Sequence, residues 1–268
     1  MRDTFSPLKV GFVIIVLFIQ SSCTVFKTNK NMHFSDNPVV AHRGAFKNMS
    51  LPQNSIASLK QAVTLGCTGT EFDVHMTADE VLVLNHDPVY FKIPVEKTNY
   101  NVLNENKLSN GESLPLLRTA LQEGMKNNKT TRLICEIKPS TISKERGQYI
   151  AEKVLELVKE LKAEKYMVYI SFDFDILKKI TEINPDANTQ YLNGDKTPLE
   201  LKQAGIRGAD YHYSVFKKNP QWIQMAKETN IDLNAWTVNK EEDMRWFIDK
   251  GFDFITTDEP EKLLQILK

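Results

Sequence analysis

The chain has 268 residues, of which 41% are hydrophobic, and its 34 basic residues balance its 34 acidic ones. This length fits one large domain better than two, because α/β barrels reach about 250 residues as a single unit. The balanced charge argues against a protein that holds nucleic acid by bulk electrostatics, while it allows a local basic pocket for one phosphate. We therefore expect no nucleic-acid partner, and no pattern in the sequence indicates an obligate protein partner.

Residues 1–23 have the layout of a bacterial export signal. Basic residues flank the start, residues 10–19 form an apolar run, and two serines precede Cys23. The run is shorter than the ~20 apolar residues that span a bilayer, so an uncleaved membrane helix is the weaker alternative. The cysteine resembles the lipidated cysteine of a bacterial lipoprotein signal, although Gln20 stands where such signals usually carry an aliphatic residue. We predict export to the bacterial cell envelope, periplasmic or on the outer face, with a lipid anchor at Cys23 that holds the protein to the membrane.

After a polar tether at residues 24–37, strand and helix patterns alternate to the end of the chain. Asn54 is a plausible N-cap of the first helix, and Gly66 a plausible end. Short apolar runs predict strands at residues 38–41, 69–74, 81–84, 132–137, 167–171, 189–192, 209–213, 233–238 and 253–256. Helical spacing predicts helices at residues 55–65, 114–125, 148–161, 220–228 and 241–249.

This alternation implies parallel strands and a single closed barrel over residues 38–268. The predicted strands are one too many for an eight-stranded barrel, and one connection breaks the alternation. Residues 77–80 are too short for a crossover helix, so we expect a hairpin there. A two-residue turn would set Glu71 opposite His86. Residues 88–113 lack periodicity and form an insertion on the face where barrel active sites lie.

Ionisable side chains gather at the ends of predicted strands, where barrel enzymes keep their catalysts. His42 and Arg43 close the first strand. A histidine moves protons near neutral pH, and the planar guanidinium of an arginine matches phosphate oxygens. Glu71 and Asp73 are two apart on the second strand and face the same way. Two such acids repel each other unless a cation lies between them, and oxygen-only ligands favour Mg²⁺ or Ca²⁺ over zinc.

Three further strand ends extend this set. His86 follows the third predicted strand, and Glu136 and Lys138 share one face of the fourth. Glu136 is a candidate third carboxylate on the metal, and Lys138 a candidate phosphate contact. Trp236 would form an apolar wall at the pocket mouth. Each cluster taken singly has a plain structural alternative, such as a surface His–Arg pair, carboxylates at a solvated strand edge, a buried histidine, an internal ion pair or a core tryptophan.

The order of these motifs resembles the glycerophosphodiester phosphodiesterase family. The similarity runs from about residue 39 to residue 260 and implies a distorted (β/α)8 TIM barrel with a short insertion after the His-Asp strand. The matching motifs are His-Arg-Gly at 42–44, Glu-x-Asp at 71–73, His-Asp at 86–87, Glu-x-Lys at 136–138, Trp-Thr-Val-Asn at 236–239 and Thr-Asp-Glu-Pro at 257–260.

The resemblance also implies catalytic, metal-binding and substrate-binding roles. One departure is Gln53, which stands where the family usually has a glutamate, so the pocket carries less negative charge. The residues that match the family are His42 and His86 for the acid–base pair, Glu71, Asp73 and Glu136 for the metal ligands, and Arg43, Lys138 and Trp236 for the substrate contacts.

The implied activity is hydrolysis of a glycerophosphodiester to glycerol 3-phosphate and an alcohol, with one Ca²⁺ or Mg²⁺. In the family, the glycerol 2-hydroxyl attacks phosphorus while one histidine takes its proton and the other protonates the leaving alcohol. Water then opens the cyclic phosphate. Two alternatives stay open at this point. One is a phosphodiester lyase of the same superfamily that stops at the cyclic phosphate, and the other is a lipoprotein that binds a glycerophospho group without cutting it.

Overall fold

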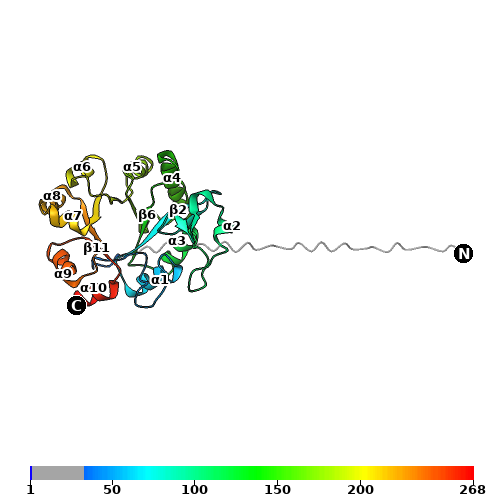
Figure 1. The fold of residues 1–268 in the computed structure, drawn as a ribbon, viewed down its shortest axis with the longest axis horizontal. Helices are drawn as coiled ribbons and strands as arrows, with labels where there is room; N and C mark the ends of the chain where they lie inside the picture. The colour runs from blue at the N-terminus through cyan, green and yellow to red at the C-terminus, as the bar shows by residue number, and fades with distance from the viewer. Residues whose placement is uncertain (2–32) are drawn as a thin grey trace.

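The structure of the chain, a computed structural model, describes Met1 and residues 33–268 (Figure 1). The predicted signal peptide, Cys23 and most of the predicted tether lie outside the described residues. Of the helices that the structure does describe, none has both the length and the apolar character needed to cross a bilayer.

The predicted barrel is present. The strands are ordered β1-β11-β10-β9-β8-β7-β6-β2-β3, and β1 also pairs with β2, which closes eight parallel strands into a ring (Figure 1). The ring consists of β1 (Val39–Ala41), β2 (Gly69–Met76), β6 (Arg132–Ile137), β7 (Met167–Ser171), β8 (Thr189–Tyr191), β9 (Gly208–His212), β10 (Asp232–Trp236) and β11 (Phe254–Thr257). Around it lie α1 (Ile56–Leu65), α3 (Leu117–Met125), α4 (Lys144–Leu161), α5 (Phe174–Ile183), α6 (Pro198–Gln203), α7 (Tyr213–Lys218), α8 (Gln221–Thr229), α9 (Glu241–Asp249) and α10 (Pro260–Ile266), with a short 3-10 turn, η2 (Glu164–Tyr166), before β7.

The surplus strand is β3 (Leu82–Leu84), which pairs antiparallel with the end of β2 outside the ring. The predicted hairpin is therefore correct, but its predicted register is wrong by one residue. Val74 lies opposite Leu84, so His86 falls level with Phe72 rather than with Glu71. The physical reason is a three-residue loop in place of the expected two-residue turn. Its last residue, Glu80, takes a left-handed conformation with φ of 61°, which is typical of three-residue hairpin loops.

The insertion after β3 folds into small elements of its own. These are β4 (Val89–Tyr90), β5 (Ile93–Pro94), η1 (Val95–Lys97) and α2 (Tyr100–Leu103). They share a separate core of Val83, Tyr90, Val95, Leu103 and Leu114, which attaches the insertion to β3.

Alternation along the strands decides which side chains face the pocket. On β6, Leu133, Cys135 and Ile137 join the core between the sheet and the helices. Ile134 instead lies inside the ring, in a second apolar cluster that also includes Val40. The inner face of β6 therefore carries apolar residues deep in the barrel and polar residues near the mouth.

Helix α1 begins at Ile56, one residue later than predicted. Ser55 is the N-cap, since its side-chain oxygen accepts a hydrogen bond from the backbone N–H of Ser58, and the prediction that Asn54 caps this helix is wrong. Asn54 is buried instead. Its Nδ2 donates to Asp73 Oδ2 at 2.8 Å, and its Oδ1 accepts from the backbone N–H of Asp73 at 3.0 Å. Gly66 ends the helix as predicted, in a left-handed conformation with φ of 73°.

Candidate active site

A cavity of about 110 Å³ opens at the carboxyl ends of the barrel strands. A larger groove, of about 790 Å³, lies between α1, the insertion and α3, and none of the residues predicted to form the site lines it. The smaller cavity is lined by His42, Arg43, Glu71, His86, Glu136, Lys138, Ile170, Phe172, Leu192, Asp210, Trp236, Thr237 and Thr256. Every predicted site residue of the barrel is in that set except Asp73, whose Oδ1 lies 2.8 Å from Lys138 Nζ.

Three carboxylates meet on adjacent strands at the base of this cavity. Glu71 and Asp73 project from β2, Glu136 lies beside Asp73 on β6, and one oxygen of each lies within 4.8 Å of the others. All three side chains are buried. Burial, with repulsion from the neighbouring acids, holds the pKa of Glu71 well above its ordinary value and raises the pKa of Glu136 to about 7. Glu71 Oε1 is buried and has no hydrogen-bond partner among the described residues.

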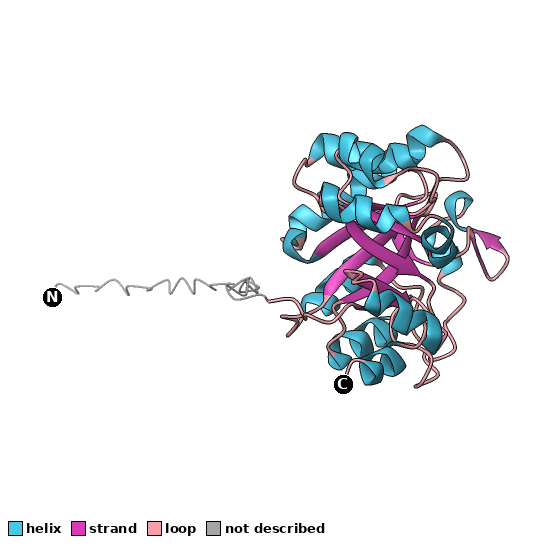
Figure 2. Ribbon diagram, turned by 90° about the vertical axis from the view of Figure 1, so that its left-hand side faces the viewer, coloured by secondary structure: helices cyan, strands magenta, loops and turns pink. Residues whose placement is uncertain are grey.

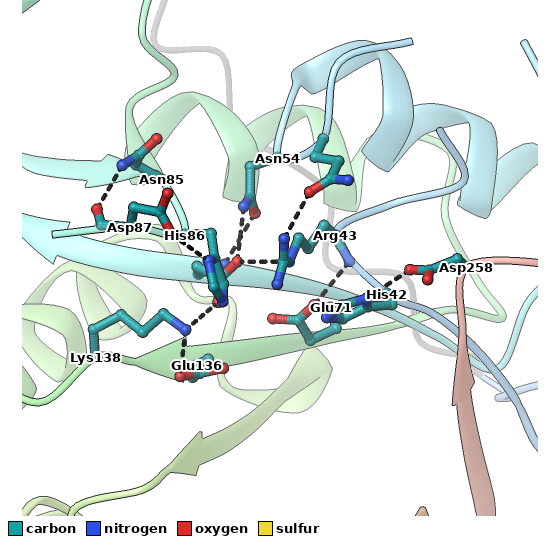
Figure 3. Close-up of polar contacts among 12 residues, drawn as sticks. His42, Arg43, Asn54, Glu71, Asn85, His86, Asp87, Glu136, Lys138 and Asp258 are labelled. Carbon is teal, nitrogen blue, oxygen red and sulfur yellow. Dashed lines mark hydrogen bonds and ion pairs between the residues drawn. The ribbon is translucent and has the colours of Figure 1, made fainter. Parts of the chain in front are cut away.

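Two cations border the carboxylates (Figure 3). Lys138 Nζ lies 2.8 Å from Asp73 Oδ1 and 2.7 Å from Glu136 Oε1, and Arg43 Nε lies 3.5 Å from Asp73 Oδ2. Burial opposes ionisation of Asp73, but Lys138 and the hydrogen bond from Asn54 outweigh it and lower its pKa. Burial opposes the charge of Lys138, but Asp73 and Glu136 outweigh burial and raise its pKa, so the Lys138 ammonium stays charged.

The loop after β1 aims Arg43 into the cavity. Gly44 has φ of 81°, and a Cβ there would lie 2.4 Å from Ser58 Oγ, so only glycine fits this close turn. The backbone N–H of Arg43 donates to Glu71 Oε2 at 2.8 Å. Gln53 Oε1 accepts from Arg43 Nη1 at 2.7 Å, so the residue that departs from the family pattern still orients the guanidinium, without adding a charge.

Each histidine of the cavity is bonded to its own carboxylate. His42 Nδ1 lies 2.7 Å from Asp258 Oδ1, and His86 Nδ1 lies 2.7 Å from Asp87 Oδ1 (Figure 3). A carboxylate at Nδ1 favours the tautomer with the proton there and leaves Nε2 as the base. Burial lowers the pKa of His86. The charge of Asp73 opposes this effect, and the charge of Lys138 reinforces it.

Asp258 is a positioning group that sequence reasoning missed. Its Oδ2 accepts from Asn239 Nδ2 at 2.7 Å, and its pKa is lowered, because the bonds to His42 and Asn239 outweigh burial. The signal for both residues was present in the Trp-Thr-Val-Asn and Thr-Asp-Glu-Pro motifs. Only the folded barrel brings the ends of β10 and β11 beside His42.

The far side of the cavity is apolar. Trp236 and Phe172 pack edge to face with ring centroids 5.5 Å apart, and Trp236 Nε1 donates to the backbone oxygen of Asp210 at 2.9 Å. Trp236 therefore forms the predicted wall. Asp210 is a further buried carboxylate that sequence reasoning missed, and burial followed by repulsion from Glu136 holds its pKa well above the ordinary value.

The closed barrel, with a cavity of ionisable side chains at the carboxyl ends of its strands, defines the class of protein: a (β/α)8-barrel enzyme. The sequence profile of the Glycerophosphoryl diester phosphodiesterase family matches residues 42–262, and the chain belongs to that family. The predicted resemblance, the barrel fold and the assignment as a phosphoric diester hydrolase of glycerophosphodiesters are thereby confirmed.

Individual relatives agree over nearly the whole barrel. A crystal structure of a glycerophosphodiester phosphodiesterase from Parabacteroides distasonis is 41% identical, has a TM-score of 0.83, and covers 88% of this chain and 98% of its own. A glycerophosphodiester phosphodiesterase from Caldanaerobacter subterraneus is 28% identical over 245 residues, which are 86% of this chain and 97% of the relative. An Oleispira antarctica phosphodiesterase, solved with the product sn-glycerol-3-phosphate, shares the fold at 19% identity with a TM-score of 0.72, covering 88% and 97% of the two chains.

Proposed function

We propose that the enzyme hydrolyses glycerophosphodiesters to glycerol 3-phosphate and an alcohol by metal-assisted proton transfer between His42 and His86. The observation that carries this proposal is the pairing of each histidine with its own carboxylate, on the rim of one cavity that also holds three buried acids. A protein that only bound the glycerophospho group would not need two oriented proton-transfer groups. The product complex of the Oleispira antarctica relative supports the same substrate class.

Glu71, Asp73 and Glu136 are the proposed metal ligands. Their oxygens converge within 4.8 Å, and Glu71 Oε1 is buried without a partner among the described residues, so a small cation fits this donor set. An all-oxygen set suits Mg²⁺ or Ca²⁺. A bound divalent ion would supply Lewis-acid stabilisation of the charge that develops on the phosphoryl oxygens.

Charge balance supports the same conclusion. With Arg43 and Lys138 beside it, the three-carboxylate site carries one net negative charge. A divalent ion would turn this into one net positive charge. An anionic phosphodiester would then be attracted rather than repelled. Arg43 and Lys138 lie on the cavity wall, where they are placed to contact the non-bridging phosphate oxygens.

The two histidines divide the proton transfers between them. One Nε2 takes the proton of the attacking glycerol 2-hydroxyl as its oxygen bonds to phosphorus. The other histidine gives a proton to the leaving alcohol as that P–O bond breaks. In the second step the roles reverse: the oxygen of water bonds to phosphorus as the P–O bond to the glycerol 2-oxygen breaks, the proton of water goes to one histidine, and the 2-oxygen takes a proton from the other. Asp258 stabilises the imidazole of His42 when it is charged, and Asp87 does the same for His86.

We also propose that the protein is exported and anchored to the membrane through Cys23, on the signal-like pattern of residues 1–23 alone. Mass spectrometry of the mature N-terminus should find a diacylated or triacylated Cys23. An intact Met1, or an unmodified soluble N-terminus, would contradict this proposal.

A product assay tests the activity. The purified protein should release glycerol 3-phosphate from one or more of glycerophosphocholine, glycerophosphoethanolamine, glycerophosphoglycerol and glycerophosphoinositol, and the preferred diester identifies the alcohol. A cyclic phosphate as the final product would show a lyase instead. Tight binding of a diester without any turnover, in the presence of added Mg²⁺ or Ca²⁺, would show a binding protein.

A further inference from the structure

Large apolar side chains are exposed on the loops that surround the pocket mouth. Met49, 57% exposed, lies on the loop after β1, and Ile142, 52% exposed, lies on the loop after β6. Val89 and Phe91, 42% and 57% exposed, belong to the β4–β5 hairpin that follows His86. Each of the three loops thus carries a pocket residue and, a few positions later, an apolar side chain in solvent.

The β4–β5 hairpin is apolar on both of its faces. Tyr90 pairs with Ile93, and Tyr90 is 4% exposed in the core of the insertion. Val89 lies on the opposite, solvent-exposed face, where a hairpin is normally polar. Phe91, in the turn, packs edge to face against Tyr90 with ring centroids 4.8 Å apart, and more than half of its side chain stays exposed. Figure 2 shows these two short strands as a small hairpin set apart from the barrel strands. Its outer face therefore has the composition of a contact surface.

The tip of the hairpin holds an aromatic residue at a strained position. Phe91 and Lys92 form the two-residue loop, with φ of 48° and 68°. Both positions of such a turn favour Asn and Gly, because a larger side chain in the left-handed region crowds its own backbone. Phe91 nevertheless stands at this position with more than half of its side chain in solvent.

The hairpin is also fixed to the catalytic segment. Asn85 Nδ2 donates to the backbone oxygens of Asp87 and Val89, at 2.6 and 3.1 Å, so these bonds tie the start of the hairpin to the His86 segment. A surface in contact with Phe91 and Lys92 would therefore lie at a fixed distance from the pocket.

We propose that the β4–β5 hairpin inserts Phe91 and Val89 into the headgroup region of a phospholipid bilayer and holds the pocket mouth at that surface. An exposed aromatic beside a lysine suits this region, where rings lie among the headgroups and Lys92 meets their phosphates. The inference rests on the proposed function for its choice of partner, since a glycerophosphodiester is the polar part of a phospholipid.

Fluorescence of the full chain on vesicles tests this contact. The sequence has three tryptophans, so wild type supplies the background. Phe91→Trp should add an emission that shifts to the blue on phosphatidylcholine–phosphatidylglycerol vesicles and loses most of its intensity when their acyl chains are brominated. Ile183→Trp is the matched control, because Ile183 is 49% exposed at the end of α5 that leads into β8, away from the mouth, and its added emission should stay unquenched.

Unquenched Phe91→Trp emission, or quenching of Ile183→Trp as strong as that of Phe91→Trp, would overturn the proposal. If Phe91→Trp does not fold, Val89→Trp on the exposed face of the same hairpin replaces it. Hydrolysis of water-soluble glycerophosphocholine, measured in parallel, should be unchanged in both variants. Failure of wild type in that assay would count against the proposed function, while the quenching result would still decide whether the hairpin meets the bilayer.

Discussion

The two sides of the pocket have different chemistry. The side built from β1, β2, β3 and β6 carries the charged groups, and the side built from β7, β8 and β10 presents Ile170, Phe172, Leu192 and Trp236. On the charged side, each buried acid or base has an opposite charge or a donor in contact, which offsets much of the cost of burial. The apolar side excludes water and so strengthens those interactions. Apart from Asp210 of β9, the ionisable groups that line the cavity lie on one side, and apolar side chains line the other.

The largest expected effect is loss of one metal ligand on the charged side. Glu136→Gln should lower kcat/KM by about 10³-fold or more, because a cation supplies several kcal/mol of charge stabilisation and each 1.4 kcal/mol is about tenfold. Isothermal titration of Mg²⁺ and Ca²⁺ should show weaker binding, and chelator should stop turnover by wild type. Glu105→Gln, an exposed glutamate of the insertion, is the control. Full activity of Glu136→Gln in chelator would refute the metal assignment.

Removing either histidine should have the next largest effect. His42→Ala and His86→Ala should each lower kcat by about 10²–10⁴-fold, the usual contribution of a general acid or base. The double variant should be little worse than either single one, because groups that work as a unit lose activity non-additively. Circular dichroism and metal titration should match wild type. Independent, multiplying losses would show that the two histidines do not act in one proton-transfer cycle.

The apolar side should respond through binding rather than chemistry. Trp236→Leu should raise KM by about tenfold with a smaller change in kcat, since it removes apolar contact area and no reacting group. Trp246→Leu, on α9 away from the cavity, is the matched control. A fall in kcat with unchanged KM would place Trp236 among the reacting groups and abolish the distinction between the two sides.

The smallest expected effect concerns the attachment of the insertion that follows His86. Glu96 is buried and accepts from Ser140, Thr141 and Arg146 at 2.6, 2.7 and 3.0 Å. Burial opposes its ionisation, but these bonds outweigh it and hold its pKa below the ordinary 4.5. A lowered folded-state pKa stabilises the fold above about pH 4.5, and this stability is lost as pH falls through the folded-state value.

Glu96→Gln should therefore lower the melting temperature near neutral pH and flatten its decline below about pH 4.5. Thermal unfolding from about pH 3 to pH 7 measures both effects, with Glu105→Gln again as the control for losing a carboxylate. A variant whose melting curve falls in acid as steeply as that of wild type would show that Glu96 does not hold the insertion through its charge.

Much of the charged side could be predicted because its residues obey local rules. Glu71 and Asp73 share a strand face, as Glu136 and Lys138 do, and the barrel brings all strand ends to one rim. The hairpin at residues 77–80 could be recognised from its length, but its register depended on Glu80 taking a left-handed conformation. Nothing in the local pattern distinguishes a three-residue loop from a two-residue turn there.

The remaining site residues depend on long-range packing. Asp258 meets His42 only because β11 lies beside β1 in the closed ring, and Asn54 is free to bond Asp73 only because Ser55 caps α1 in its place. Asp210 lies within an ordinary strand pattern, and only burial in the same cavity as Glu136 sets it apart. Periodicity shows which face of a strand is buried but does not identify its neighbours across a barrel.

The central claim, that His42 and His86 form an acid–base pair, is tested most directly by the leaving-group dependence of the two alanine variants. A nitrophenyl diester of glycerol phosphate needs little protonation of its leaving group, so it should restore the rate of the variant that lacks the acid far more than that of the variant that lacks the base. The account predicts this asymmetry, which also identifies the acid. Equal rescue of both variants, or near-normal turnover of glycerophosphocholine by either one, would contradict it.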